Sequence, residues 1–140
     1  WCGVILDGLH VHPLAVKVAL AAKPRGKLLI VTDAMSPVGT NQTEFDFFDG
    51  KVIRDGNKLT NLNGNLAGSV LDMAGAVSYA VKELGLELSE AVRMASLYPA
   101  EFLGISAERG QILVGAKADL VLLNDEGLVQ QCWLEGRPSI

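Results

Sequence analysis

Two short, uninterrupted apolar runs near the start of the chain predict buried β-strands. The first is Gly3-Val4-Ile5-Leu6, which ends at the turn signal Asp7-Gly8, and the second is Lys27-Leu28-Leu29-Ile30-Val31-Thr32. Between them, Pro13 suits the first turn of a helix whose apolar face continues to the breaker Lys23-Pro24-Arg25-Gly26. This order predicts a βαβ unit, and continuously apolar strands are typical of a parallel sheet covered on both faces.

The pattern changes after the second strand. Spaced aromatic residues and the turn signals Asp49-Gly50 and Asp55-Gly56 predict short antiparallel strands over about residues 44–60. Residues 61–69 are interpreted as a loop, and the helical spacing of apolar residues predicts a helix over about 70–84. The remaining predicted elements are two short helices and two strands joined by a hairpin: 89–97, 99–104, 118–123 and 129–134.

Composition and charge narrow the class of protein. The 140 residues are 49% hydrophobic, which is enough for one globular core. The 12 Lys and Arg residues against 16 Asp and Glu residues give a net charge of −4 with no basic block, which argues against nucleic-acid binding. No stretch reaches the roughly 20 apolar residues that span a bilayer. Two cysteines without metal or disulfide spacing favour the cytoplasm, and a chain that opens at Trp1 before an apolar run is expected to be cut from something longer.

Asp33 is the first candidate for chemistry. It directly follows a predicted buried strand, at the carboxyl end where parallel α/β folds place catalytic groups. The alternative interpretation is an aspartate that caps the following turn, and position alone does not separate the two.

His10 follows the other predicted strand, so both strands would bring polar groups to the same rim of the sheet. The spacing of His10-Val11-His12 suits a metal-binding pair, but one nearby carboxylate and no further histidine fall short of a complete site. We therefore expect His10 to contact a substrate, and His12 only to cap a helix or face solvent.

The segment Asn65-Leu66-Ala67-Gly68-Ser69 precedes the helix predicted at 70–84. Backbone N–H groups at a helix start are free to bind an anion or a polar substrate group. The alternative is that Ser69 is a plain N-cap, and no phosphate-loop lysine is present.

Taken together, these segments resemble the N-acetylglucosamine-6-phosphate deacetylases of the amidohydrolase superfamily. Any one motif is weak, but the set occurs in the family's order and extends over nearly the whole chain. The matching motifs are Asp7-Gly8-Leu9-His10-Val11, Val31-Thr32-Asp33-Ala34-Met35, Leu66-Ala67-Gly68-Ser69, Ala91-Val92-Arg93-Met94-Ala95-Ser96-Leu97-Tyr98-Pro99-Ala100, Gly110-Gln111-Ile112 and Gly115-Ala116-Lys117-Ala118-Asp119-Leu120-Val121.

The resemblance implies an α/β fold in which the two apolar strands belong to the last two βα units of a TIM-type (β/α)₈ barrel. Residues 1–108 would form the C-terminal part of that barrel, with a β-hairpin insertion at about 44–60. Residues 109–140 would supply the C-terminal strands of a small β-sandwich domain. A piece of this kind is incomplete on its own.

The family hydrolyses the acetamide of N-acetylglucosamine 6-phosphate to glucosamine 6-phosphate and acetate, with one or two divalent metal ions, of which Zn²⁺ is expected here. By this similarity Asp33 takes a proton from the metal-activated water and returns it to the departing amine. His10 would contact the substrate, and Leu66, Ala67 and Gly68 would line the sugar site. The principal metal ligands are expected upstream of this chain, with Asp33 as a possible ligand, so the chain alone is expected to be inactive. A homodimer is also implied.

Three alternatives stay open. The same chemistry could act on N-acetylgalactosamine 6-phosphate, which the resemblance barely separates from the other sugar. The chain could be a catalytically silent binding partner of the same fold, although a silent module has no need of Asp33. A self-sufficient small α/β domain is disfavoured, because two parallel strands alone leave unpaired edges and an uncovered apolar face.

Overall fold

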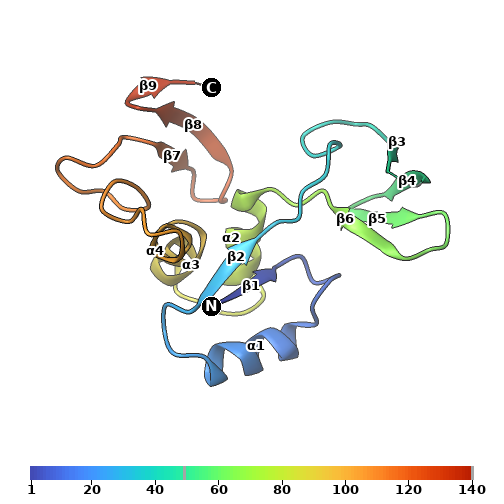
Figure 1. The fold of residues 1–140 in the computed structure, drawn as a ribbon, viewed down its shortest axis with the longest axis horizontal. Helices are drawn as coiled ribbons and strands as arrows, with labels where there is room; N and C mark the ends of the chain where they lie inside the picture. Colours follow the sequence, from blue (N-terminus) through green and yellow to red (C-terminus); the bar gives the residue numbers. More distant parts are fainter. Residues whose placement is uncertain (49, 140) are drawn as a thin grey trace.

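The computed structural model describes residues 1–48 and 50–139. Asp49, one half of a predicted turn, lies outside the described residues. Within those two ranges, no helix is both long enough and apolar enough to cross a bilayer. The strands and helices form a central α/β body with a separate small sheet projecting on either side of it (Figure 1).

The centre of the body is the predicted βαβ unit. Strand β1 (Cys2–Ile5) pairs in parallel with β2 (Leu28–Val31), and helix α1 (Pro13–Ala22) connects them. Ile5 lies opposite Val31, so the two strands end side by side. The chain leaves both carboxyl ends on the same rim, which confirms the expectation that residues following the two strands are neighbours.

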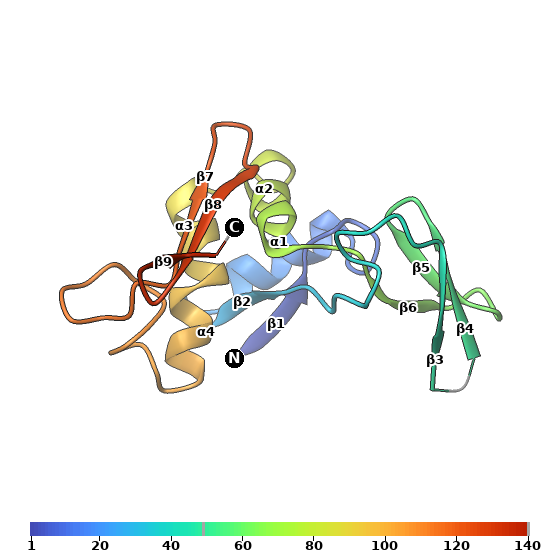
Figure 2. The same cartoon turned by 90° about the horizontal axis from the view of Figure 1, so that it is seen from above.

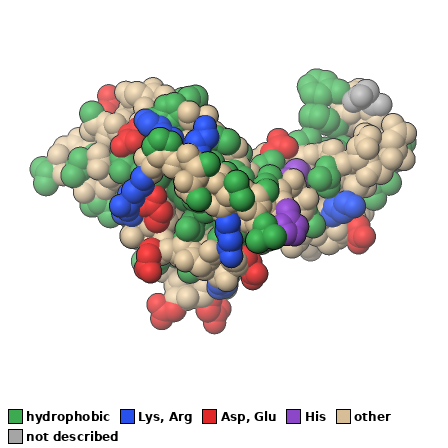
Figure 3. Space-filling view, turned by 90° about the horizontal axis from the view of Figure 1, so that it is seen from below, with side chains coloured by type: hydrophobic (Ala, Val, Ile, Leu, Met, Phe, Trp, Pro, Cys, Tyr) green, Lys and Arg blue, Asp and Glu red, His purple; other side chains and the backbone are tan. Residues whose placement is uncertain are grey.

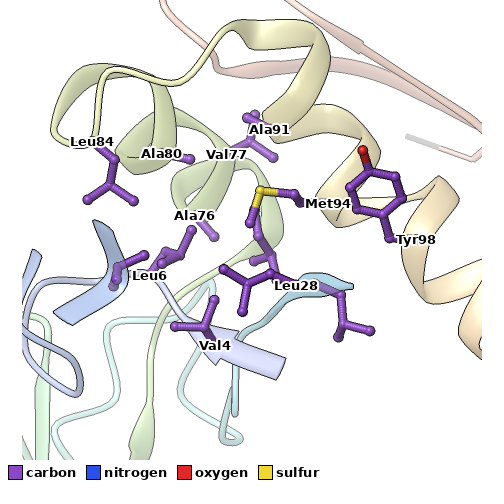
Figure 4. Packing of buried hydrophobic residues seen from close by; sticks show 13 residues of the cluster. Val4, Leu6, Leu28, Ala76, Val77, Ala80, Leu84, Ala91, Met94 and Tyr98 are labelled. Atoms are coloured by element: carbon purple, nitrogen blue, oxygen red, sulfur yellow. The ribbon is translucent and has the colours of Figure 1, made fainter. Parts of the chain in front are cut away.

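Three further helices pack around this strand pair. They are α2 (Met73–Lys82), α3 (Leu88–Ala95) and α4 (Leu97–Phe102), close to the predicted positions. Burial of their apolar faces against the strands is the dominant stabilising contribution. The resulting core is drawn in Figure 4, with Val4, Leu6, Leu28, Ala76, Val77, Ala80, Leu84, Ala91, Met94 and Tyr98 labelled.

Within the described residues, helices cover only one face of the strand pair, which leaves the uncovered face expected for two parallel strands alone. Figure 2 shows α1 and α2 on the same side of β1 and β2. Val4 and the first three residues of β2 are buried in the core, whereas Gly3 and Val31 stay exposed. The reason is that the described elements place one helical layer against a sheet of two strands.

A four-stranded antiparallel sheet follows β2. Its strands are β3 (Glu44–Phe47), β4 (Gly50–Asp55), β5 (Lys58–Asn61) and β6 (Leu66–Ser69), paired in chain order. The hairpins predicted at about 44–60 are therefore present, but residues 66–69 form a strand and not the predicted loop. The loop prediction failed because it considered local composition alone, whereas β6 is held by backbone pairing with β5 and with Ala34.

The C-terminal sheet confirms the two predicted strands and adds a third. It contains β7 (Leu120–Leu123), β8 (Val129–Leu134) and the two-residue β9 (Arg137–Pro138), all antiparallel. The turn between β7 and β8 reaches α2, where the Nζ of Lys82 donates a 3.3 Å hydrogen bond to the carbonyl oxygen of Glu126.

Candidate active site

Asp33 stands two residues beyond Val31, the last residue of β2, in a left-handed backbone conformation with φ +52°. Such a conformation is uncommon for residues other than glycine and persists only when the surrounding structure holds it. Here the Asp33 carbonyl oxygen accepts a 2.8 Å hydrogen bond from the Ser69 N–H, and the Met35 N–H donates one of 2.9 Å to the Ser69 carbonyl oxygen. The end of β6 thus clamps the backbone on both sides of Ala34 and leaves the Asp33 side chain at the exposed rim.

Ser69 is the buried centre of this clamp, with 1% of its surface exposed. Its hydroxyl donates a 2.5 Å hydrogen bond to the Thr32 carbonyl oxygen and accepts one of 3.1 Å from the Leu71 N–H. The interpretation of Ser69 as an N-cap is wrong. The cap of α2 is Asp72, whose Oδ1 accepts from the Gly75 N–H at 2.6 Å.

The predicted sugar-lining segment lies beside Asp33. Gly68 has φ +75°, and a Cβ placed on it would lie 2.3 Å from the Met35 Cγ and 3.2 Å from the Asp33 carbonyl oxygen. Only glycine allows this approach without displacing the loop that follows β2. Leu66 is exposed and Ala67 is half-buried, so both offer surface near this rim.

His10 is held at the end of β1 by Asp7. The carboxylate Oδ1 of Asp7 accepts hydrogen bonds from the N–H groups of Leu9 at 2.9 Å and His10 at 3.0 Å, and its Oδ2 lies 2.7 Å from the His10 Nδ1. Burial acts to raise the pKa of Asp7, but the two backbone donors and the imidazole together outweigh it and lower that pKa below its ordinary value. The sequence predicted a turn at Asp7-Gly8 but did not indicate that the Asp7 carboxylate would hold His10.

His12 has a different task, as expected. It is the N-cap of α1, and its Nδ1 accepts a 3.2 Å hydrogen bond from the Leu14 N–H, directly before Pro13 in the first helical position. The two rings therefore bind different partners and do not act as a pair. Within residues 1–48 and 50–139 no group of three His, Cys, Asp or Glu side chains is placed to hold a metal ion. Figure 3 shows histidine atoms at the surface, near the junction of the body with the β3–β6 sheet.

Two hollows lie near the strand pair, at opposite ends of it. The smaller, of about 290 Å³, borders the rim and includes Asp7 and Tyr79 in its lining. The larger, of about 610 Å³, is lined by Arg25 on the turn that leads into β2, together with Glu90 on α3 and Tyr98 on α4. That turn is at the amino end of β2, away from Asp33, so we regard the smaller hollow as the one that adjoins the candidate site despite its size.

The geometry of the site indicates a class of protein, the α/β enzymes. A parallel βαβ unit with a constrained aspartate at the carboxyl end of one strand is the arrangement by which α/β enzymes present catalytic groups. Residues 17–138 match the sequence model described as the amidohydrolase family, and the chain therefore belongs to that family.

Individual relatives are sugar-phosphate deacetylases by name. An N-acetylgalactosamine-6-phosphate deacetylase from Shewanella sp. (strain ANA-3) is 54% identical over 97% of this chain and 34% of the relative. The N-acetylglucosamine-6-phosphate deacetylase of Bos taurus is 33% identical over 96% of this chain and 33% of the relative. The crystal structure of N-acetylglucosamine-6-phosphate deacetylase from Pasteurella multocida superposes with a TM-score of 0.94 at 34% identity, covering 98% of this chain and 36% of that one. This chain thus spans about a third of the length of these relatives, and its predicted resemblance to the deacetylases is confirmed.

Proposed function

We propose that this chain supplies the catalytic carboxylate and part of the sugar site of an N-acetylhexosamine-6-phosphate deacetylase. The observation that carries the proposal is the clamp on Asp33, because a strained conformation held by a second strand is characteristic of functional sites. The similarity to named deacetylases over nearly the whole chain supports the same conclusion. In relatives of this length, two thirds of the protein lie outside the matched segment.

The proposed reaction is hydrolysis of the acetamide. A water oxygen attacks the acetyl carbon while the Asp33 carboxylate accepts a proton from that water. The carbon–nitrogen bond then breaks, and Asp33 returns the proton to the departing amine. The products are acetic acid, which loses its remaining proton to give acetate, and the free amino-sugar 6-phosphate, and Asp33 returns to its starting state.

The proposed substrate contacts come from both sides of Asp33. His10 at the end of β1 would bind the sugar from one side, and Leu66, Ala67 and Gly68 on β6 would line it from the other. Contacts on both sides would restrict how the bound sugar can move. They would thereby hold its acetamide within reach of the Asp33 carboxylate.

The sequence identities to named relatives support N-acetylgalactosamine 6-phosphate as the substrate. Identity is 54% to a relative named for N-acetylgalactosamine 6-phosphate and 33% to one named for N-acetylglucosamine 6-phosphate. We therefore propose N-acetylgalactosamine 6-phosphate as the better substrate and the gluco epimer, our first expectation, as the second. The epimers differ at one hydroxyl, so hydrogen bonding to that group would separate them.

The metal, the partner and the compartment remain proposals for the longer protein. The described residues do not fit a metal site, so we assign no step to a metal held by this chain and expect the ligands of a Zn²⁺ ion to come from elsewhere. A homodimer and a cytoplasmic location are likewise proposed, the latter supported by two cysteines that form no disulfide. Residues 1–108 and 109–140 are proposed to belong to a barrel and a β-sandwich respectively.

The test is a chimera in which this chain replaces the equivalent third of the Shewanella relative. With Zn²⁺ added, we expect acetate release from N-acetylgalactosamine 6-phosphate, little from this chain alone, and loss of activity in the chimera carrying Asp33→Asn. Asp46→Asn, on the exposed strand β3, is the matched control and should stay active. A folded chimera that releases no acetate from either epimer would instead favour the catalytically silent binding partner.

A further inference from the structure

The contact between Asp7 and His10 determines which nitrogen of the imidazole carries the hydrogen. The carboxylate is 8% exposed and the imidazole 15% exposed, so their 2.7 Å contact is largely shielded from water. The lowered pKa of Asp7 keeps it ionised at neutral pH, and an ionised carboxylate has only acceptors to offer. The hydrogen between the two groups must then belong to the His10 Nδ1.

A hydrogen on Nδ1 fixes the other ring nitrogen as well. In the neutral imidazole one nitrogen donates and the other accepts, so Nε2 carries a free lone pair. No hydrogen bond joins Nε2 to any residue within 1–48 or 50–139. The backbone N–H groups of Leu9 and His10 hold the same carboxylate through its Oδ1, so the Asp7 Oδ2 stays fixed at the position where it meets the ring.

We propose that Asp7 is a positioning residue that locks His10 in the Nδ1–H tautomer and presents its Nε2 as the acceptor for a hydroxyl of the substrate sugar. The proposal deepens the proposed function and rests on it for the identity of the ligand. The state of the ring itself does not depend on the ligand. In this proposal Asp7 acts through the ring that it orients.

The other histidine of the chain, His12, serves as an internal control, because its Nδ1 accepts a hydrogen bond where that of His10 donates one. The His12 Nδ1 accepts a hydrogen bond from the Leu14 N–H and so carries no hydrogen, which places the hydrogen of neutral His12 on Nε2. The two histidines, which are the only ones in the chain, should thus be opposite tautomers.

The first test is long-range ¹H–¹⁵N correlation of the His10 and His12 imidazoles in the ¹⁵N-labelled chimera at about pH 8, above the ordinary pKa of free imidazole. We expect a protonated Nδ1 in His10 and a protonated Nε2 in His12. Asp7→Asn should shift His10 toward Nε2–H, whereas Asp72→Asn, a matched carboxylate that caps α2, should leave it unchanged. Predominant Nε2–H in His10 of the unmodified chimera would overturn the proposal, even if Asp7→Asn failed to fold.

The second test is kinetic and uses the chimera. Asp7→Asn and His10→Asn should each lower kcat/KM by about 10–100-fold, as loss of a group that orients a ligand does. The double variant should lose no more than His10→Asn alone, because Asp7 acts through His10. Additive losses would contradict the proposal. Failure of the proposed function would look different, since the unmodified chimera would then release no acetate while the tautomers of both rings stayed as expected.

Discussion

The N–H of Ser69 donates a 2.8 Å hydrogen bond to the carbonyl oxygen of Asp33, and this contact joins the end of β6 to the residue that follows β2. The two residues are joined although strands β3, β4 and β5 and most of β6 lie between them in the sequence. It also explains how Asp33 keeps φ +52° without being glycine. The candidate carboxylate is therefore positioned by a strand that does not belong to the βαβ unit.

Removal of the Ser69 hydroxyl should loosen this clamp. Ser69→Ala leaves the Thr32 carbonyl and the Leu71 N–H without their buried partner, and the free energy of unfolding should fall by about 1–3 kcal/mol. Urea unfolding of the two proteins measures the difference. Ser36→Ala, in the exposed part of the same loop, is the control and should change stability by less than about 0.5 kcal/mol. Equal stability of both variants would show that the hydroxyl does not hold the loop.

Gly68 should resist substitution for two separable reasons. In Gly68→Ala the new methyl group would overlap Met35 and adopt φ +75°, so we expect a loss of about 2–4 kcal/mol. Gly64→Ala has a similar φ of +82° but nothing within 4 Å, so it should cost only about 1 kcal/mol. Thermal unfolding of both variants isolates the packing contribution, and equal losses would contradict a close approach to Met35.

Gly8 should be restricted by a different neighbour. A Cβ on Gly8, which has φ +73°, would lie 2.9 Å from the Tyr79 hydroxyl oxygen. Gly8→Ala should therefore displace Tyr79 and disturb the turn that holds His10, with a loss of about 1–3 kcal/mol. Adding Tyr79→Phe removes that oxygen and should recover part of the loss. Denaturant unfolding of the single and double variants measures the recovery, and none would mean that the backbone conformation alone is responsible.

Glu90 should make the chain sensitive to acid. Its Oε2 accepts from Arg25 at 2.9 Å and from Arg93 at 2.6 Å, and its Oε1 accepts from the Tyr98 hydroxyl at 2.7 Å. Burial acts to raise the pKa of Glu90, but these three donors outweigh burial and lower it to about 2 from an ordinary value of 4.5.

A carboxyl group with a lowered pKa in the folded state stabilises that state above its ordinary pKa, and this stabilisation is lost as the pH falls. The window here runs from 4.5 down to about 2, and we expect about 1–3 kcal/mol to disappear across it, with partial screening by water included. Glu90→Gln should be less stable at neutral pH and show a flatter acid dependence. Glu101→Gln, at an exposed position on α4, should keep the slope of the unmodified chain.

The sequence by itself determined the elements whose signals are local. Continuous apolar runs predicted β1 and β2, helical spacing predicted α2, and Pro13 after His12 marked the start of α1. It also determined the family, because ordered motifs resemble the deacetylases without any knowledge of the fold. The position of Asp33 directly after an apolar strand was enough to make it a candidate.

Only the tertiary structure decided how the site is held. The local pattern could not exclude Ser69 as a helix cap, because its actual partners, Thr32 and Asp33, lie far away in the sequence. The strand character of residues 66–69 was missed for the same reason, since a strand is completed by hydrogen bonds to other segments and carries few signals of its own. A local sequence pattern reflects only the conformational preferences of neighbouring residues. The hydrogen bonds between Ser69 and the loop after β2 form only when folding brings these distant backbone groups together.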